Sequence, residues 1–200
     1  MCDKDLLYIE DAHNQKLYYR FTPAAVVSNF IPLVVVLNDE KKAHSSDFEY
    51  KMWNILTPVY THGDENKELL QKLIKQIAQE HECEDHIYLY GNSTGGYGAI
   101  LHGILSKANA VFAHTPRIRL LDTNSTQSDL TNLLNPTDSL PIFYLCGNES
   151  NPEDDTAYFA DACKKNGIKV HLDFCPKSDE DENHRLQEVL NFFERVASQN

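Results

Sequence analysis

The pattern Gly-x-Ser-x-Gly at positions 91–95, with Ser93 at its centre, constrains the fold of this chain more than any other sequence feature. It follows the β-prone run 86–90 and precedes a small-residue segment that can continue as a helix. A serine on so sharp a strand-to-helix turn needs glycine on both sides, because a Cβ there would collide with the backbone. The turn would hold the Ser93 hydroxyl at a helix N-terminus, where free N–H groups favour a developing negative charge.

A second interpretation of this segment is a glycine- and serine-rich turn that only reverses the chain or holds a phosphate. The least favoured interpretation is a phosphate- or nucleotide-binding loop over residues 91–98. The chain lacks both the lysine of a P-loop and the GxGxxG order at this position.

Strand and helix patterns alternate along the rest of the chain. Two β-prone runs at 6–10 and 16–21 predict a hairpin, and the apolar run 33–37 lacks alternation, as a strand covered on both faces does. The other expected elements, besides the strand and helix around Ser93, are strands at 53–60, 108–113, 141–146 and 168–174, a short helix within 40–51, and helices at 64–81, 152–165 (with Pro152 in its first turn) and 184–197. This order predicts an α/β fold, a three-layer α/β/α sandwich with a mostly parallel sheet and an antiparallel N-terminal hairpin.

Composition restricts the class of protein. With 200 residues, 42% of them hydrophobic, residues 1–200 are expected to form a single domain. The net charge of −12 disfavours nucleic acid and anionic membranes as partners. The start of the chain is polar, and no apolar run approaches the ~20 residues that span a bilayer, so we expect a cytoplasmic location. The five cysteines lack CxxC spacing, so we expect them reduced and mostly buried, with no metal site.

A base and an acid are needed to activate Ser93, since a serine hydroxyl becomes a good nucleophile when a carboxylate-oriented histidine accepts its proton. Such partners are expected at the carboxyl ends of later strands. Of the nine histidines, His184 follows the last strand in a loop just before the last helix and is the favoured base. His114, after a strand, is a weaker candidate, and the helix after Ser93 should carry His102 away from this edge. A surface histidine at a helix N-terminus is the other interpretation of His184.

The carboxylate is expected on the loop after the strand at 141–146. Glu149 lies closest to the strand end and is the first choice. Asp154 and Asp155 are alternatives, although both would lie in the first turn of the next helix, where its dipole alone favours a carboxylate. The acidic run 179–182 would raise the pKa of His184 if it lay close, and is otherwise a solvated loop.

From about residue 33 onward, the chain resembles an α/β-hydrolase of the esterase/lipase-like kind, through the motif at 91–96, the acid-bearing loop and the late histidine. To a lesser extent, residues 95–99 are similar to hydrolase-like proteins of bacterial surface-polysaccharide biosynthesis. The resemblance implies a serine esterase with no cofactor. Its oxyanion hole would use the backbone N–H of Thr94 and a donor from the Asn38-Asp39 turn.

Two positions depart from that family. Ser150 stands where such enzymes commonly carry aspartate, and Asn38-Asp39 replaces His-Gly. Two functions therefore stay open. One is a serine hydrolase that cleaves a small or soluble ester, such as an acetyl group on a carbohydrate, through an acyl-enzyme. The other is an inactive hydrolase-like protein that binds a glycan or protein partner in surface-polysaccharide biosynthesis. Only the segment 115–138 is long enough for a lid, so we expect an open site.

Overall fold

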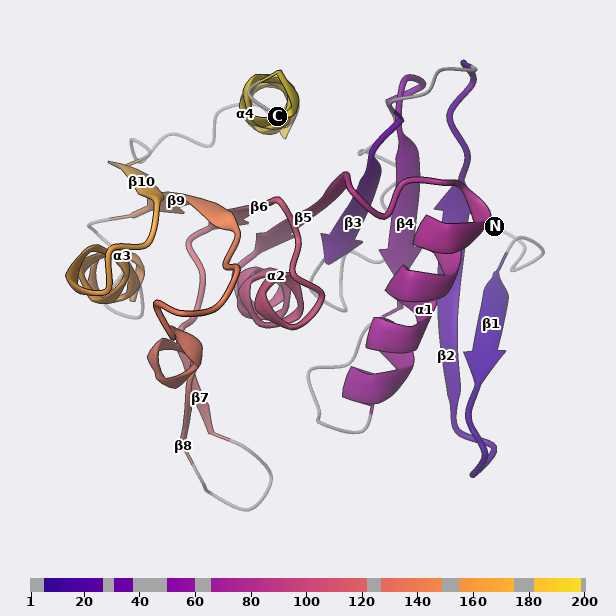
Figure 1. Cartoon of the computed structure of the whole chain (residues 1–200), viewed down its shortest axis with the longest axis horizontal. Coiled ribbons are helices and arrows are strands. Elements are labelled where there is room, and N and C mark those ends of the chain that lie inside the picture. Colours follow the sequence, from indigo (N-terminus) through magenta and orange to yellow (C-terminus); the bar gives the residue numbers. More distant parts are fainter. Residues whose placement is uncertain are drawn as a thin grey trace.

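The computed structural model describes residues 6–26, 31–37, 50–59, 66–121, 127–148, 155–174 and 182–198 (Figure 1). At residues 121, 127 and 182–187 it describes the backbone alone.

An eight-stranded sheet forms the centre of the molecule, in the order β1-β2-β4-β3-β5-β6-β9-β10. The hairpin β1–β2 and the pair β2–β4 are antiparallel, whereas all the other pairs are parallel. This confirms the mostly parallel sheet with an antiparallel start. The strands are β1 (Leu7–Glu10), β2 (Lys16–Thr22), β3 (Leu33–Leu37), β4 (Asn54–Pro58), β5 (Ile87–Asn92), β6 (Ala110–His114), β9 (Ile142–Gly147) and β10 (Val170–Phe174).

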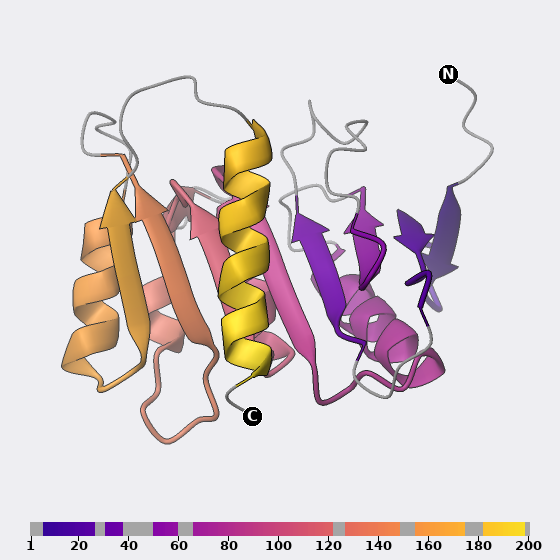
Figure 2. The same ribbon diagram turned by 90° about the horizontal axis from the view of Figure 1, so that it is seen from above.

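Helices cover the two faces of the sheet unequally. Three of them, α1 (Lys67–Glu80), α2 (Thr94–Leu105) and α3 (Thr156–Lys165), lie on one face, and α4 (Glu182–Ala197) lies on the other (Figures 1 and 2). Each face has its own apolar core, and β3 contributes to both: Val35 packs with the first core and Val34 with the second. This two-sided burial explains the absence of alternation in β3 and confirms the three-layer sandwich.

The parallel strands place their carboxyl ends at one edge of the sheet, and α4 begins at that same edge (Figure 2). The residues that directly follow β5, β6, β9 and β10 therefore lie at the same edge of the sheet, although these four positions are far apart in sequence. This edge is where the candidate site has to be sought.

Helix α3 begins later than expected. It starts at Thr156, with Asp155 as its N-terminal flanking residue, so the prediction that Pro152 lies in its first turn is wrong. Asp155 is held by Arg119 from a distant part of the chain, an interaction that no local pattern reveals. The short helix expected within 40–51 lies outside the described residues, except for its last two positions.

The segment 115–138 carries structure that was not predicted. It forms the antiparallel pair β7 (Arg119–Leu121) and β8 (Gln127–Asp129), followed by a 3-10 turn, η3 (Leu130–Leu133). Ile118, Leu130 and Leu134 are buried in the core on the α1–α3 side. In addition, Tyr97 Oη and Ser128 Oγ are 2.7 Å apart in a hydrogen bond that ties β8 to α2. The described part of this segment therefore packs on α2 and α3.

The described cysteines agree with the expectation in two cases and differ in one. Cys83 and Cys163 are free and buried, and burial raises the pKa of their thiols to about 11 and about 12. Cys146, near the end of β9, is disulfide-bonded, so the prediction of reduced cysteines is wrong for this residue. Its partner lies outside the described residues. A disulfide depends on two Cα atoms lying about 5–6 Å apart in space, which CxxC spacing does not test.

None of the helices in the described ranges combines the length and hydrophobicity that a membrane span requires.

Candidate active site

Ser93 occupies a strained turn between the last residue of β5 and the first residue of α2. Its backbone angles, φ 53° and ψ −117°, lie in a region that residues with a side chain rarely adopt. Three backbone hydrogen bonds hold it there: Ser93 N–H donates to His114 O at 2.9 Å, and Ser93 O accepts from the N–H groups of Tyr97 and Arg117, both at 3.3 Å. Ser93 is partly exposed. The elbow that the motif predicts is thus formed.

Glycine is required at position 91 by the close return of α2 over the end of β5. A Cβ on Gly91 would lie 2.1 Å from Gly95 O and 2.8 Å from Gly96 N. These are backbone atoms of the first turn of the helix, so they cannot move aside as a flexible side chain could. A Cβ on Gly96 would lie 3.0 Å from Pro116 Cβ, in the chain that follows β6. The small residues of the motif therefore fit the elbow between β5 and its neighbour β6.

His114 lies beside the elbow, at the end of β6. It pairs in register with Asn92, and its Nδ1 is 3.3 Å from Asn92 Oδ1. Thr115 Oγ1 also donates to Asn92 Oδ1 at 3.3 Å, and the His114 side chain is 8% exposed. The weaker of the two histidine candidates is thus the one whose contacts with the elbow are described. These contacts fix the residue before Ser93, which makes His114 a supporting residue of the turn.

His184 lies within the first turn of α4. The helix starts at Glu182, two residues before the predicted start, so the expectation of a loop position for His184 is wrong. Acidic residues are favoured in a first helical turn, which is consistent with an earlier start at Glu182. The backbone places this turn of α4 at the strand-end edge (Figure 2). The pairing of Ser93 with His184 stays a prediction, since the described side chains of α4 begin at residue 188.

Among the three candidate acids, Asp155 alone is described, and it is engaged elsewhere. Its carboxylate accepts hydrogen bonds from the guanidinium of Arg119, with Arg119 Nε 3.3 Å from Asp155 Oδ2, and this bond raises the pKa of Arg119. Arg119 also stacks over the ring of Tyr158, at 4.9 Å from its centroid. Asp155 therefore ties α3 to β7. Glu149 and Asp154 lie outside the described residues, as do Asn38, Asp39 and positions 179–181.

Thr94 is the first residue of α2 and follows Ser93 directly. The first N–H groups of a helix have no partner within the helix, so they are available to an oxyanion. The Thr94 hydroxyl is buried and has no hydrogen-bond partner among the described residues. Within those residues, no three His, Cys, Asp or Glu side chains are placed to hold a metal ion.

Comparison with known proteins gives a similarity in structure alone, because no family model and no curated protein sequence matches this chain. A brefeldin A esterase, described as a bacterial homologue of human hormone-sensitive lipase, superposes with a TM-score of 0.72 at 13% identity, over 100% of this chain and 80% of that one. Esterase 2 of Thermogutta terrifontis superposes with a TM-score of 0.71 at 14% identity, over 100% of this chain and 96% of that one. Est1E from Butyrivibrio proteoclasticus superposes with a TM-score of 0.65 at 12% identity, over 98% of this chain and 100% of that one.

The chain has the α/β-hydrolase fold. The fold that the resemblance implied is therefore confirmed. At sequence identities of 12–14%, these similarities show a shared fold alone. The similarity to polysaccharide-biosynthesis proteins stays a prediction.

His102 is a histidine that this fold keeps in its core. It lies on α2, fully buried, with its Nδ1 2.7 Å from Gln71 Nε2 of α1. Burial lowers the pKa of His102 to about 3. As predicted, α2 carries it away from the strand-end edge, and it serves the packing of α1 on α2.

We expect the neutral His102 to make folding stability depend on pH. Its pKa is lowered in the folded protein, so the unfolded chain binds the proton first and stability falls as pH drops below about 6.5. From pH 7 to pH 5 this residue should cost the wild type about 2 kcal/mol of unfolding free energy. Urea unfolding at both pH values would show that His102→Asn loses less stability on acidification than the wild type. His13→Asn, in the exposed turn between β1 and β2, is the control substitution. Equal losses in all three proteins would contradict this account.

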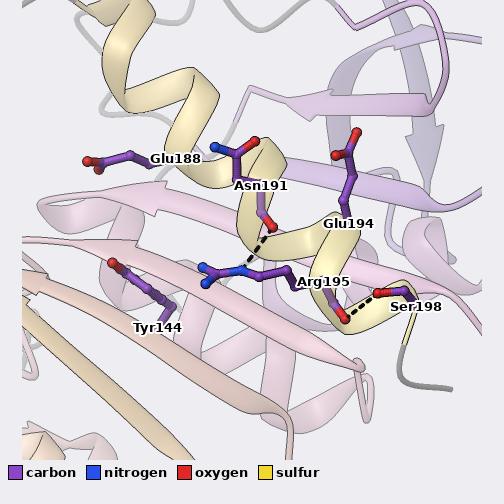
Figure 3. A pocket seen from close by; sticks show the side chains of 6 residues that line it. All are labelled: Tyr144, Glu188, Asn191, Glu194, Arg195 and Ser198. Carbon is purple, nitrogen blue, oxygen red and sulfur yellow. Dashed lines mark hydrogen bonds between the residues drawn. The ribbon is translucent and has the colours of Figure 1, made fainter.

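Two pockets lie on the α4 face of this α/β-hydrolase fold. The larger, of about 520 Å3, lies between β9 and α4 (Figure 3) and is lined by Tyr144, Glu188, Asn191, Glu194, Arg195 and Ser198. The smaller, of about 200 Å3, shares Tyr144 and Arg195 and also contacts His171 of β10. No lining residue of either pocket belongs to β5, α2 or the turn at Ser93. Both pockets are therefore separate from the turn at Ser93, as far as their described lining shows.

Proposed function

We propose that this protein is a serine esterase that cleaves a small or soluble ester through an acyl-enzyme intermediate on Ser93. The observation that carries the proposal is the backbone of Ser93, with φ 53° and ψ −117° at a strand-to-helix turn. Such a conformation costs about 1–3 kcal/mol in a residue with a side chain, and glycine would relieve it. A turn that only reversed the chain would gain nothing from a serine there, whereas a nucleophile needs the hydroxyl raised at that point.

The reaction would begin when Ser93 Oγ attacks the carbonyl carbon of the ester. A new C–O bond forms, and the hydroxyl proton passes to His184. The negative oxygen would accept hydrogen bonds from the Thr94 backbone N–H and from a donor in the Asn38-Asp39 turn. When the intermediate collapses, the bond to the alcohol breaks and the alcohol leaves with the proton from His184. Water, deprotonated by His184, then attacks the acyl carbon and releases the acid and Ser93.

Glu149 is the acid that we propose to orient His184. It follows the end of β9 by two residues, and β9 is the neighbour of β10 in the sheet. The chain enters α4 soon after β10. The geometry argues against Asp155, because its carboxylate is bound by Arg119. Asp154 precedes the residue at the α3 N-terminus and remains the alternative.

The substrate that we propose is a small or soluble ester, with an acetyl group on a carbohydrate as one example. Two observations support an open site. Ser93 is partly exposed, and the described part of the segment 115–138 packs against α2 and α3 through buried Ile118 and Leu130. The solved structures with the same fold include esterases.

Labelling with a fluorophosphonate probe tests the proposal. The folded wild type is expected to react, and peptide mapping should place the label on Ser93. Ser93→Ala should lose the label. Ser106→Ala is a matched control, because Ser106 lies at the other end of α2 and its hydroxyl donates a hydrogen bond to His102 O. If the folded protein stays unlabelled while a control esterase reacts, Ser93 is not an activated nucleophile and a non-catalytic binding protein becomes the better account.

A further inference from the structure

Strand β10 ends the sheet and presents an unprotected edge. It pairs with β9 on one side, and no other described strand lies on its other side. His171, Asp173 and Phe174 are exposed, the last by 41%, and Val170 and Leu172 are partly buried. Natural edge strands are commonly blocked by proline, a bulge or an inward-pointing charge. The five residues of β10 pair continuously with β9 and contain neither proline nor a bulge.

The backbone of β10 has a defined outward side. Phe143 N–H of β9 donates to Lys169 O at 3.1 Å, just before β10 begins. Alternate residues of a strand direct their N–H and C=O groups to opposite sides, so His171 and Asp173 face β9. Val170, Leu172 and Phe174 therefore present their N–H and C=O groups outward. Phe174 N–H donates to Asp173 Oδ1, and the others have no backbone partner among the described residues. Such groups form a ready template for another strand.

We propose that two copies of this chain associate by antiparallel pairing of β10 with β10, about a two-fold axis at Leu172. In this register Leu172 faces Leu172 of the second copy, and Val170 faces Phe174. All three are outward-facing residues, so every N–H and C=O that they present would be paired. The two sheets would then be continuous, with the same faces on the same side.

Charge and the length of β10 together favour this register. His171 of each copy comes to lie opposite Asp173 of the other, in a pair without backbone hydrogen bonds, where side chains approach most closely. Centring the pair on Asp173 instead would place two carboxylates opposite each other, and centring it on His171 would set Asp173 and Phe174 against Lys169 and Ile168, which precede β10. Like charges directly opposite are unfavourable.

The present contacts of Asp173 are compatible with this exchange. Its Oδ1 accepts from Phe174 N–H at 2.8 Å, and its Oδ2 accepts from Tyr144 Oη at 3.3 Å. On association Phe174 N–H would donate to Val170 O of the second copy, which frees Oδ1 for His171. The bond to Tyr144 can persist. On the other face of the sheet, the exposed ring of Phe174 would pack against Val170 of the second copy.

The dimer would also border the α4-face pockets. His171 lines the smaller pocket together with Tyr144 and Arg195, and both of these also line the larger one (Figure 3). The second copy's strand would lie next to His171, on the side of the pocket that faces the free edge.

Sedimentation velocity over a range of protein concentrations tests the proposal. The wild type is expected to dimerise. His171→Glu and Asp173→Lys should each weaken the dimer about tenfold or more, because the first sets two carboxylates opposite each other and the second removes the carboxylate that faces His171. The double variant His171→Glu/Asp173→Lys should restore dimerisation, since it again sets opposite charges against each other across the two strands. This recovery separates a broken interface from a damaged fold.

Two further variants complete the test. Leu172→Pro removes an outward N–H that makes no bond to β9, so the variant should fold, as circular dichroism would show, and be monomeric. Tyr8→Lys, on the opposite edge strand β1, should leave the dimer unchanged. A wild type that is monomeric at the highest soluble concentration would overturn the proposal. A dimer that Leu172→Pro or the single charge variants leave intact would do the same.

Discussion

Replacing Ser93 with alanine is expected to lower kcat/KM for ester hydrolysis by a factor on the order of 10⁴ or more. The change removes the only atom that can form the proposed acyl-enzyme. It leaves the turn in place, because the hydrogen bonds that hold Ser93 come from its backbone. Short p-nitrophenyl esters provide the measurement, and urea unfolding would show that the variant stays folded. Hydrolysis at the wild-type rate by Ser93→Ala would rule out the mechanism.

The partners of Ser93 can be assigned in the same assay. His184→Ala should cost about as much as Ser93→Ala, and the double variant little more, because residues that act as a unit are strongly non-additive. Glu149→Gln should also reduce kcat/KM, whereas Asp155→Asn should remain close to wild type, since Asp155 is bound to Arg119. If Asp155→Asn loses as much activity as Glu149→Gln, the acid has been assigned to the wrong residue.

Replacing Gly91 with alanine is expected to destabilise the protein by about 3 kcal/mol or more and to abolish labelling of Ser93. The added Cβ would lie 2.1 Å from Gly95 O and 2.4 Å from Gly95 C. Relief requires the first turn of α2 to move away from β5, and that movement would displace the serine between them. Urea unfolding and the fluorophosphonate assay measure the two effects.

Gly167 offers a matched control for the Gly91 substitution. It has φ 69°, and a Cβ there would meet nothing within 4 Å. Gly167→Ala therefore suffers only the cost of a left-handed backbone, about 1–2 kcal/mol, and should leave labelling intact. Equal losses of stability at the two positions would mean that the close contact at Gly91 is relieved by a small local shift, contrary to our expectation.

The elements that were predictable from the sequence are those whose signal is local. The apolar run of β3 and the helical spacing of Leu69, Leu73 and Ile77 in α1 each follow from burial on defined faces. The elbow at Ser93 was predictable for the same reason, because its demand for Gly91 comes from atoms only four or five residues away. In each case the signal itself lies within a short window of sequence.

What the sequence did not predict depends on contacts between distant segments. The strands β7 and β8 have three residues each and owe their position to docking on α2 and α3. The late start of α3 accompanies the bond between Arg119 and Asp155, which are 36 residues apart. The disulfide at Cys146 likewise depends on a distance in space. The contact of His114 with the elbow was predictable. His114 ends β6, the strand that follows α2, and β6 lies next to β5 in the sheet.

Helix α4 has a consequence for how this protein is made in the cell. It is the one described helix on its face of the sheet, where Phe193 stacks on Tyr88 at 4.9 Å and Trp53 and Phe112 lie nearby. Tyr88, Trp53 and Phe112 belong to segments that leave the ribosome well before α4. The growing chain therefore carries an uncovered aromatic surface until α4 emerges, and such exposed hydrophobic surface is prone to aggregation.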